Sequence, residues 1–326
     1  MPTISISAAN QALNQFANKF STTIHQSLKQ GLEWETMIPF EPMDYAYTGQ
    51  EMEGGSVLQP WQVAFTPNNN ESWDGITNIL QVGKVDLKFT EDQLNKFFSR
   101  HHNEWFQAGN GNDPTMWDYA KWVINNHVLY QAQEDLNRSA YIGVYAAPTP
   151  GTADAMVDTF NGWAKGITDL VDANEIVPLT TGALLSGSMV DQVRDFCAQL
   201  PINYRYKPGK LFMSKTRAQQ YSDNYKAMWP QRDINVQMGT AHDLVLKVDD
   251  YNKKIVGMTS MEGSDRILLV FDDPNLRSLI IGNRTGYAAY PVFRFEPFDR
   301  TLKCFAEVYR VFGFESTKHF FCNEQE

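Results

Sequence analysis

The spacing of apolar residues changes along the chain, and the first clear pattern is a strand followed by a helix. Residues 84–89 read KVDLKF, with apolar and polar side chains in strict alternation, which predicts a half-buried strand. Thr90 follows as a helix cap, and residues 91–106 begin with two acidic residues, which favour a helix N-terminus. The segment therefore predicts a strand that leads directly into a short helix.

A long helix is predicted over residues 114–138. Asp113 supplies a cap and Pro114 a first-turn proline, and the helix spans roughly 37 Å at 1.5 Å per residue. A helix this long is expected to form a spine of the fold, and a broad apolar face is formed by Trp117, Ala120, Val123, Ile124, Leu129, Ala132 and Leu136.

Two further amphipathic helices are expected before the pattern changes to strands. One begins at Thr152, with apolar residues at helical spacing at Met156, Phe160, Trp163, Ile167 and Leu170. The other follows a cap at Ser188 and ends before Pro201, with Val190, Val193, Phe196 and Leu200 on its apolar face.

Strands dominate the C-terminal part of the chain. Residues 208–221 predict a strand, a serine cap and a helix, and short strands follow at 245–251, 254–258 and 266–271 between turn residues. Residues 290–315 form a long, alternating, aromatic segment. The predicted fold class is therefore α+β, with two interleaved domains.

An acidic block that precedes the strand at residues 84–89 has a composition of its own. From residue 30 to residue 83 there is no Lys or Arg, and the acidic residues are Glu33, Glu35, Glu41, Asp44, Glu51, Glu53, Glu71 and Asp74. Short apolar runs between Gly, Pro and Asn clusters predict a long β-hairpin arm, with a structureless acidic loop as the alternative. A two-stranded hairpin is marginal alone, so we expect it to pack on a neighbouring subunit's basic surface.

Basic and aromatic residues interleave in one later segment. Its cations are Arg205, Lys207, Lys210, Lys215 and Arg217, and its aromatic residues are Tyr204, Tyr206 and Phe212. This strip could contact single-stranded nucleic acid by stacking and charge, but the charge balance of the chain favours a neighbour's acidic surface. The aromatic residues of the acidic block, Tyr45, Tyr47, Trp61, Phe65 and Trp73, suit interface anchors. The predicted inter-subunit residues are Glu41, Asp44, Glu51, Glu53, Trp61, Glu71, Trp73, Arg205, Lys207 and Lys210.

Composition narrows the functional classes. The chain has 326 residues and a formal net charge of −10, which opposes tight phosphate binding and disfavours a DNA-reading protein. No apolar run is long enough to span a bilayer and the start has no signal-peptide layout, so we expect no membrane contact and synthesis in the cytoplasm. The three cysteines have no metal-binding spacing and are predicted to be buried thiols.

Candidate catalytic and metal sites are weak. His101 and His102 are adjacent and cannot both face one ligand with Glu104. A Ser188, Asp191 and His242 set lacks a nucleophile elbow, and the glycines at 54–55, 109 and 111 lack phosphate-loop spacing. We therefore predict no catalytic residue, no cofactor and no metal, and a protein that is not an enzyme.

The order of these elements resembles the major capsid proteins of tailed phages, of the Hong Kong 97 type fold. The acidic loop with KVDLKF behind it resembles their extended loop, and DPTMWDYAKWVINNHVLYQAQEDLNR resembles their spine helix. SMVDQVRDFCAQLPINYRYKPGKLFMSKTRAQQY, RILLVFDDPNLRSLIIGNR and FRFEPFDRTLKCFAEVYRVFGFE resemble their axial-domain and closing segments. The resemblance implies an N-terminal arm (1–32), an extended acidic β-loop (33–88), a peripheral domain (89–147 and 286–318) with the spine helix, an axial domain (148–285) and a C-terminal tail (319–326).

The resemblance also implies a function. It is that of a virion subunit, assembled in the host cytoplasm into hexamers and pentamers of an icosahedral head that encloses double-stranded DNA. The implied partners are further copies of the chain, a portal, and scaffolding or decoration proteins. Only about thirty residues precede the loop, too few for a fused scaffolding domain, and the absence of lysine between Lys29 and Lys84 predicts a shell without covalent crosslinks. The alternatives are a cargo nanocompartment shell of the same fold and a DNA- or carbohydrate-binding module.

Overall fold

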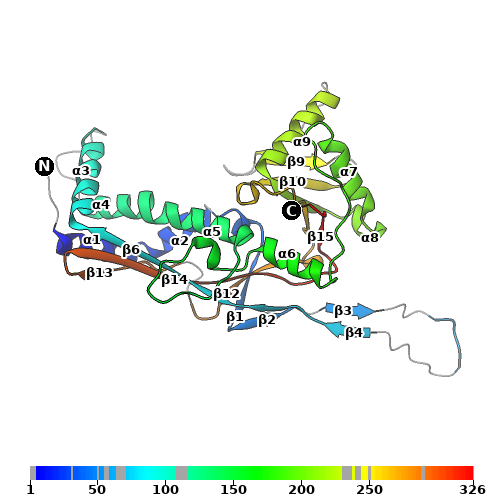
Figure 1. The fold of residues 1–326 in the computed structure, drawn as a ribbon, viewed down its shortest axis with the longest axis horizontal. Coiled ribbons are helices and arrows are strands. Elements are labelled where there is room, and N and C mark those ends of the chain that lie inside the picture. Colours follow the sequence, from blue (N-terminus) through cyan, green and yellow to red (C-terminus); the bar gives the residue numbers. More distant parts are fainter. Residues whose placement is uncertain are drawn as a thin grey trace.

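The computed structural model describes residues 5–30, 32–49, 51–54, 59–63, 71–107, 116–229, 237–238, 244–248, 251–287 and 291–325. Figure 1 shows an elongated platform that carries a compact second body above one end, and a hairpin that projects from the same end. The main hydrophobic core fills the platform and continues into the second body at Phe212, Val256 and Leu268, and the second body encloses a further core of its own.

A five-stranded sheet forms the base of the platform, with β14 (Thr301–Phe314) at its centre. β14 pairs antiparallel with β6 (Gln81–Thr90) along one edge. Along its other edge it pairs antiparallel with β13 (Arg294–Phe298) near its start and with β12 (Leu279–Arg284) near its end. β1 (Phe40–Met43) extends the sheet in parallel with β12. The long aromatic segment near the C-terminus is thus the central strand of the platform, as its alternation suggested.

One face of this sheet is covered by a long helix. α4 (Met116–Val123), a π-helical turn (Ile124–Leu129) and α5 (Tyr130–Ile142) follow each other without a break, so the predicted helix at 114–138 is observed at 116–142. The residues of its predicted apolar face that the structure describes, from Ala120 onward, are buried in the platform core.

The N-terminal segment, expected as an arm, is helical in the structure. α1 (Ile6–Lys19) begins at Ser5, whose side chain accepts a hydrogen bond from the Ala8 amide at 3.2 Å, and α2 (Ser21–Gln30) follows directly. α1 packs on α4 and β13, and its apolar residues are buried in the platform core. These helices are therefore part of the platform.

α3 (Glu91–Gln107) begins where the sequence predicted. The Thr90 hydroxyl accepts a hydrogen bond from the Gln93 amide at 3.3 Å, and the Gln93 side chain accepts one from the Thr90 amide at 2.9 Å. Each residue thus satisfies a backbone donor of the other, which fixes the helix start.

The second body contains a six-stranded mixed sheet. Its strands, in spatial order, are β15 (Phe321–Cys322), β11 (Leu268–Phe271), β7 (Gly209–Ser214), β10 (Lys253–Met258), β9 (Leu244–Val248) and β8 (Gln237–Met238). The second body also contains three helices, α7 (Met189–Gln199), α8 (Ile202–Arg205) and α9 (Lys215–Met228). Ser214 caps α9 through the Arg217 amide, so the predicted strand, serine cap and helix at 208–221 are confirmed.

One helix start was wrong, and one predicted cap forms differently from the expectation. The helix expected from Thr152 begins only at Trp163, as α6 (Trp163–Asp172), and a single 3-10 turn (Met156–Asp158) precedes it. Ser188 does occupy the cap position of α7, but its side chain makes no capping bond, and Asn224 of α9 accepts the Val190 amide instead at 3.1 Å. In both places a contact distant in sequence decides the local structure.

Candidate assembly surfaces

The acidic block forms the hairpin that the sequence predicted. β2 (Ala46–Thr48) pairs antiparallel with β5 (Thr77–Ile79), and further out β3 (Glu51–Gly54) pairs antiparallel with β4 (Glu71–Asp74). In Figure 1 this hairpin extends beyond both bodies, on the side away from β13. Its outer part therefore lies beyond the sheet and both hydrophobic cores of its own subunit.

An asparagine fixes the base of the hairpin to the platform. The Asn78 side chain accepts a hydrogen bond from the Phe314 amide at 3.0 Å and donates one to the Phe314 carbonyl at 2.8 Å, and it is buried. The side-chain amide thus pairs with the end of β14 as a neighbouring strand would. A Cβ atom on Gly313 would lie 2.1 Å from the Asn78 Oδ1 atom, so a larger residue at 313 would displace this contact.

A second contact joins the base to the same place. The Tyr47 hydroxyl donates to the Glu315 carboxylate, with oxygen distances of 2.7 and 2.8 Å, and burial together with this bond raises the pKa of Tyr47 to about 12. Gly49 packs against the Glu315 backbone so closely that a Cβ atom would lie 2.2 Å from its carbonyl oxygen. Phe314 and Glu315 are the residues at which the chain leaves the platform for the second body.

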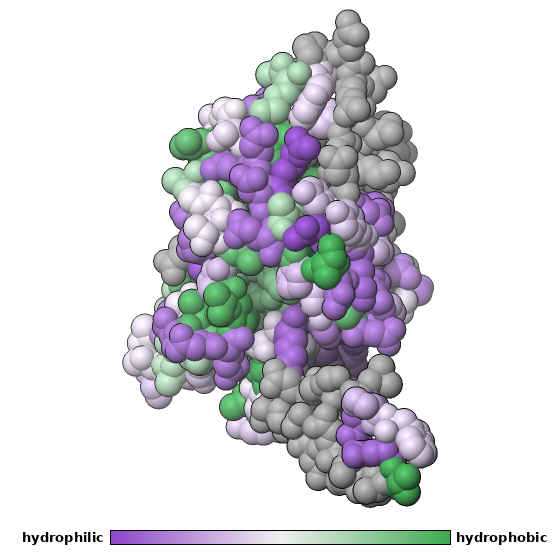
Figure 2. Space-filling model, turned by 90° about the vertical axis from the view of Figure 1, so that its right-hand side faces the viewer, coloured by the Kyte–Doolittle hydropathy of each residue, from purple (hydrophilic) through white to green (hydrophobic). Residues whose placement is uncertain are grey.

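The tip of the hairpin carries exposed apolar side chains. Trp61 is 88% exposed and Val63 is 89% exposed, whereas Tyr45 near the base is 72% exposed. Figure 2 faces the end of the molecule from which the hairpin projects, and the described part of the tip is open to solvent there. The backbones of Glu51, Glu53, Glu71 and Trp73 lie in β3 and β4, while their side chains, and all of Phe65, lie outside the described residues.

Several acidic residues of the block have partners inside the subunit. Glu41 forms an ion pair with Arg277, and Glu35 is buried against Arg310 with an Oε1–Nε distance of 3.1 Å. Glu33 accepts the amides of Thr259 and Ser260, each at 3.1 Å. Among the described acidic side chains of the block, Asp44 is exposed and available to a neighbour.

The predicted basic strip is partly neutralised within its own body. Arg205 donates to the Leu200 carbonyl, Lys210 lies 3.7 Å from an Asp272 oxygen, and Arg217 forms a bidentate pair with Asp265. Lys207 lies over the Tyr204 ring at 5.7 Å. Much of the positive charge that was predicted to contact a neighbour is therefore engaged by partners within the subunit.

The structure assembles another cationic surface, which sequence reasoning missed. The strands β6, β14 and β13 leave one face of the platform sheet open to solvent, opposite the face that the long helix covers. Alternate residues of paired strands lie on this face, and the pairing brings its charged residues together from distant segments. They are the cations Lys84, Lys88, Arg294 and Lys303, with the carboxylates Asp86, Glu296 and Glu307. The sequence indicated such a half-exposed sheet only through alternation, in residues 84–89 and in residues 301–309.

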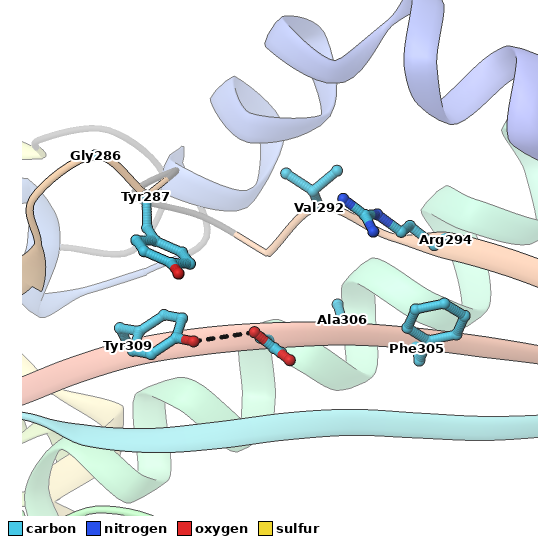
Figure 3. A pocket seen from close by; sticks show the side chains of 8 residues that line it. Gly286, Tyr287, Val292, Arg294, Phe305, Ala306 and Tyr309 are labelled. Atoms are coloured by element: carbon cyan, nitrogen blue, oxygen red, sulfur yellow. Dashed lines mark hydrogen bonds between the residues drawn. The ribbon is translucent and has the colours of Figure 1, made fainter.

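A cavity of about 290 Å³ opens at one end of this sheet face. Figure 3 shows the rings of Tyr287 and Tyr309 one above the other at one end of it, Val292 and Arg294 on its upper side, and the Tyr309 hydroxyl bonded to Glu307. That hydrogen bond is 3.0 Å long, and the tyrosine ring centroids are 4.7 Å apart. The Arg284 guanidinium lies 4.4 Å from the Tyr287 centroid and 5.0 Å from that of Tyr309, so both rings have a cation beside them.

Residues considered for chemistry do not form a reaction centre in the described part of the chain. Cys197, Cys304 and Cys322 are buried and unpaired, as predicted, and burial raises the pKa of each thiol, which opposes thiolate chemistry. Among the described residues, no three His, Cys, Asp or Glu side chains are placed to hold a metal. The side chains of His101, His102 and Glu104, residue His242 and the glycines at 55, 109 and 111 lie outside that part.

Comparison with known proteins identifies the fold. No family model matches the chain, and no curated protein matches it in sequence. The capsid of an empty GTA particle superposes with a TM-score of 0.54 at 14% identity, over 90% of this chain and 89% of that one. The satellite phage P4 procapsid, solved with its size determination protein, gives 0.52 at 12% identity, over 93% and 98%. This chain has the Hong Kong 97 type capsid fold.

The same capsid fold occurs in nanocompartments. The holo-SrpI encapsulin complex from Synechococcus elongatus superposes with a TM-score of 0.50 at 8% identity, over 88% of this chain and 85% of that one. At identities this low, the superpositions establish the fold alone. The predicted α+β class and capsid-type fold are therefore confirmed as a fold. Within the described part of the chain, every helix is too short or too polar to span a lipid bilayer.

Proposed function

We propose that this chain is the major capsid protein of a tailed bacteriophage, which assembles into an icosahedral head around double-stranded DNA. The observation that carries the proposal is a capsid fold over about nine-tenths of the chain, joined to a projecting hairpin with an exposed apolar tip. A subunit whose best-exposed apolar residues stand on an arm has its complementary surface on another molecule. The proposed role is structural and not enzymatic.

The domain division implied by the family is part of this proposal. The peripheral domain (89–147 and 286–318) lies within the platform, which also contains β1, β12 and most of β6, and the axial domain (148–285) supplies most of the second body. A hydrophobic core that lies within the second body alone supports such a division. In this assignment the long helix stiffens the platform, and the second body meets its copies at the symmetry axes as pentamers and hexamers.

Assembly follows from contacts between unlike surfaces. If the arm of one copy lies on a different surface of the next, the contact is heterologous, and repetition with rotation closes a ring. Rings of five and six are the units from which an icosahedral shell is built. Portal, scaffolding and decoration proteins would join such a shell, whose place is the virion.

The charge of the subunit suits a container for DNA. With a net charge of −10, the shell would enclose the genome without gripping its phosphates through broad cationic surfaces. A DNA- or carbohydrate-binding module would instead act as a monomer or small oligomer, so closed particles would argue against it.

A nanocompartment shell is the second candidate, and the likeness to the encapsulin complex favours it. Both candidates predict closed particles, and they differ in content. Particles purified from the native source and treated with nuclease would retain double-stranded DNA in a phage head, but would contain protein cargo in a nanocompartment.

The direct test is assembly of the chain expressed alone and with its neighbouring genes. Size exclusion and negative-stain microscopy are expected to show closed shells or ring-shaped capsomers. A matched variant with residues 51–74 replaced by a short turn keeps the clamped base at Asn78 and is expected to stay folded but not to close shells. A wild-type chain that remains a monomer under every condition would contradict the proposal.

A further inference from the structure

The open face of the platform sheet has the charge and shape of a docking surface. Together with Arg284 at its edge it carries five cations against three carboxylates, in a chain that is strongly acidic overall. One of these pairs is already internal, since Lys84 lies 2.6 Å from Asp86. The remaining cations, Lys88, Arg284, Arg294 and Lys303, give the face a local positive character.

The cavity on this face has the composition of an interface hot spot. Its wall combines Tyr287, Tyr309 and Phe305 with Arg294, and tyrosine and arginine are enriched at energetically dominant contacts. A volume of about 290 Å³ lies at the lower end of the range for small-molecule pockets, so the space suits one large side chain. A flat aromatic ring inserted there would lie among aromatic rings and beside a guanidinium.

The hairpin has complementary properties. It contains no Lys or Arg, its projecting strands carry Glu51, Glu53, Glu71 and Asp74, and Trp61 at its tip is 88% exposed. In Figure 1 the hairpin extends away from β13, and Arg294 of β13 lines the cavity, so the hairpin leads away from the cavity of its own subunit. A second copy of the chain is therefore the molecule that brings acidic strands and an exposed indole to this face.

We propose that the hairpin of one copy docks on the open sheet face of the next, with Trp61 inserted into the cavity beside Tyr287, Phe305 and Tyr309. The inference rests on the proposed function and deepens it by naming the socket. It also moves the main acceptor surface from the partly neutralised strip around Arg205 to the cations of the platform sheet. Single-stranded nucleic acid is the less favoured occupant, because the net charge of −10 opposes phosphate binding over the subunit as a whole.

A double-mutant cycle on shell assembly tests the socket. Trp61→Ala and Tyr287→Ala are each expected to raise the critical concentration for assembly about 30-fold, as truncation of a hot spot does. If the two side chains meet, the double variant is expected to show about the same 30-fold rise. Independent effects that multiply to roughly 1000-fold would overturn the proposal.

Controls separate the socket from general damage. Tyr45→Ala removes another exposed aromatic residue of the same hairpin and is expected to combine with Tyr287→Ala multiplicatively. Val292→Trp fills the cavity from within and is expected to weaken assembly as much as Trp61→Ala, with an unchanged circular dichroism spectrum of the subunit.

The failure modes are distinct. If the wild-type chain never forms particles, the proposed function fails. If particles form and Trp61→Ala and Val292→Trp assemble like wild type, only the socket fails. Normal assembly of Tyr287→Ala with less nuclease-protected nucleic acid per particle would assign the face to nucleic acid and overturn the proposal.

Discussion

Replacement of Asn78 tests whether one side chain holds the hairpin base to the platform. In Asn78→Ala, the amide and the carbonyl of Phe314 both lose their partner at a site that is only 7% exposed. An unpaired buried polar group costs about 1–3 kcal/mol, so two of them set a range of about 2–6 kcal/mol. Because the smaller side chain can admit water, we expect a loss of about 3 kcal/mol in the free energy of unfolding.

The measurement is urea unfolding of the subunit below its assembly concentration, followed by circular dichroism. Thr77→Ala is the matched control, because Thr77 adjoins Asn78 on β5 and its exposed hydroxyl contacts only that of Thr48, at 3.2 Å. We expect this control to change stability by less than about 0.5 kcal/mol. A value for Asn78→Ala as small as that of the control would refute the reasoning.

A third variant tests the direction of the hydrogen bonds. Asn78→Asp keeps an acceptor for the Phe314 amide but places a carboxylate oxygen against the Phe314 carbonyl. We expect it to be as unstable as Asn78→Ala at neutral pH. It should recover part of the loss on acidification, because the protonated acid can donate to that carbonyl. Equal stability of the two variants across the pH range would contradict this assignment.

Three further predictions concern buried charges and the finished shell. Arg310→Met removes the ion pair with the buried Glu35 carboxylate and is expected to cost about 3–5 kcal/mol in urea unfolding, much of which Glu35→Met in the same chain should restore. Burial lowers the pKa of Lys253 from 10.5 to about 8, although its ammonium donates to the carbonyls of Tyr204 and Lys207. Between these pH values the unfolded chain holds a proton that the folded chain has released, so Lys253 should make stability rise with pH by up to about 3 kcal/mol. This part of the rise should be absent in Lys253→Met, and an unchanged pH dependence in that variant would contradict the assignment. Denaturing electrophoresis of mature particles should show a single band for this chain, because the hairpin has no lysine, and covalent ladders would be the opposite outcome.

Local signals in the sequence were enough where a structure depends on neighbouring residues. The start of α3 follows from Thr90 and Gln93, and the cap of α9 from Ser214, because each of these bonds spans three residues. The alternation of residues 84–89 likewise predicted a strand with one buried face. α1 could have been found in the same way, since Ser5 precedes Ala9, Leu13 and Phe16 at helical spacing.

Sequence reasoning failed where contacts between distant segments determine the local structure. Met156 and Phe160 have helical spacing with Trp163, but Phe160 packs on Phe312, and Gly162 is placed by contact with the Tyr141 backbone. The open sheet face was missed for a related reason. Its cations are spread from residue 84 to residue 303, and only the pairing of β6, β14 and β13 brings them together.

The position of β14 also sets the order of events during synthesis. β14 pairs Thr301 with Thr90 and Arg310 with Gln81. The segment after it adds the edge strand β15 to the second sheet, where Cys322 pairs with Leu268 of β11 and accepts a hydrogen bond from the Leu179 amide. Contacts this distant in sequence form slowly, and on the ribosome they must wait for the later partner to emerge. Neither body is complete before residues 301–325 are made, so a nascent chain with a finished hairpin still lacks the surface that would receive one. In the proposed assembly, translation would therefore delay polymerisation until these residues are made.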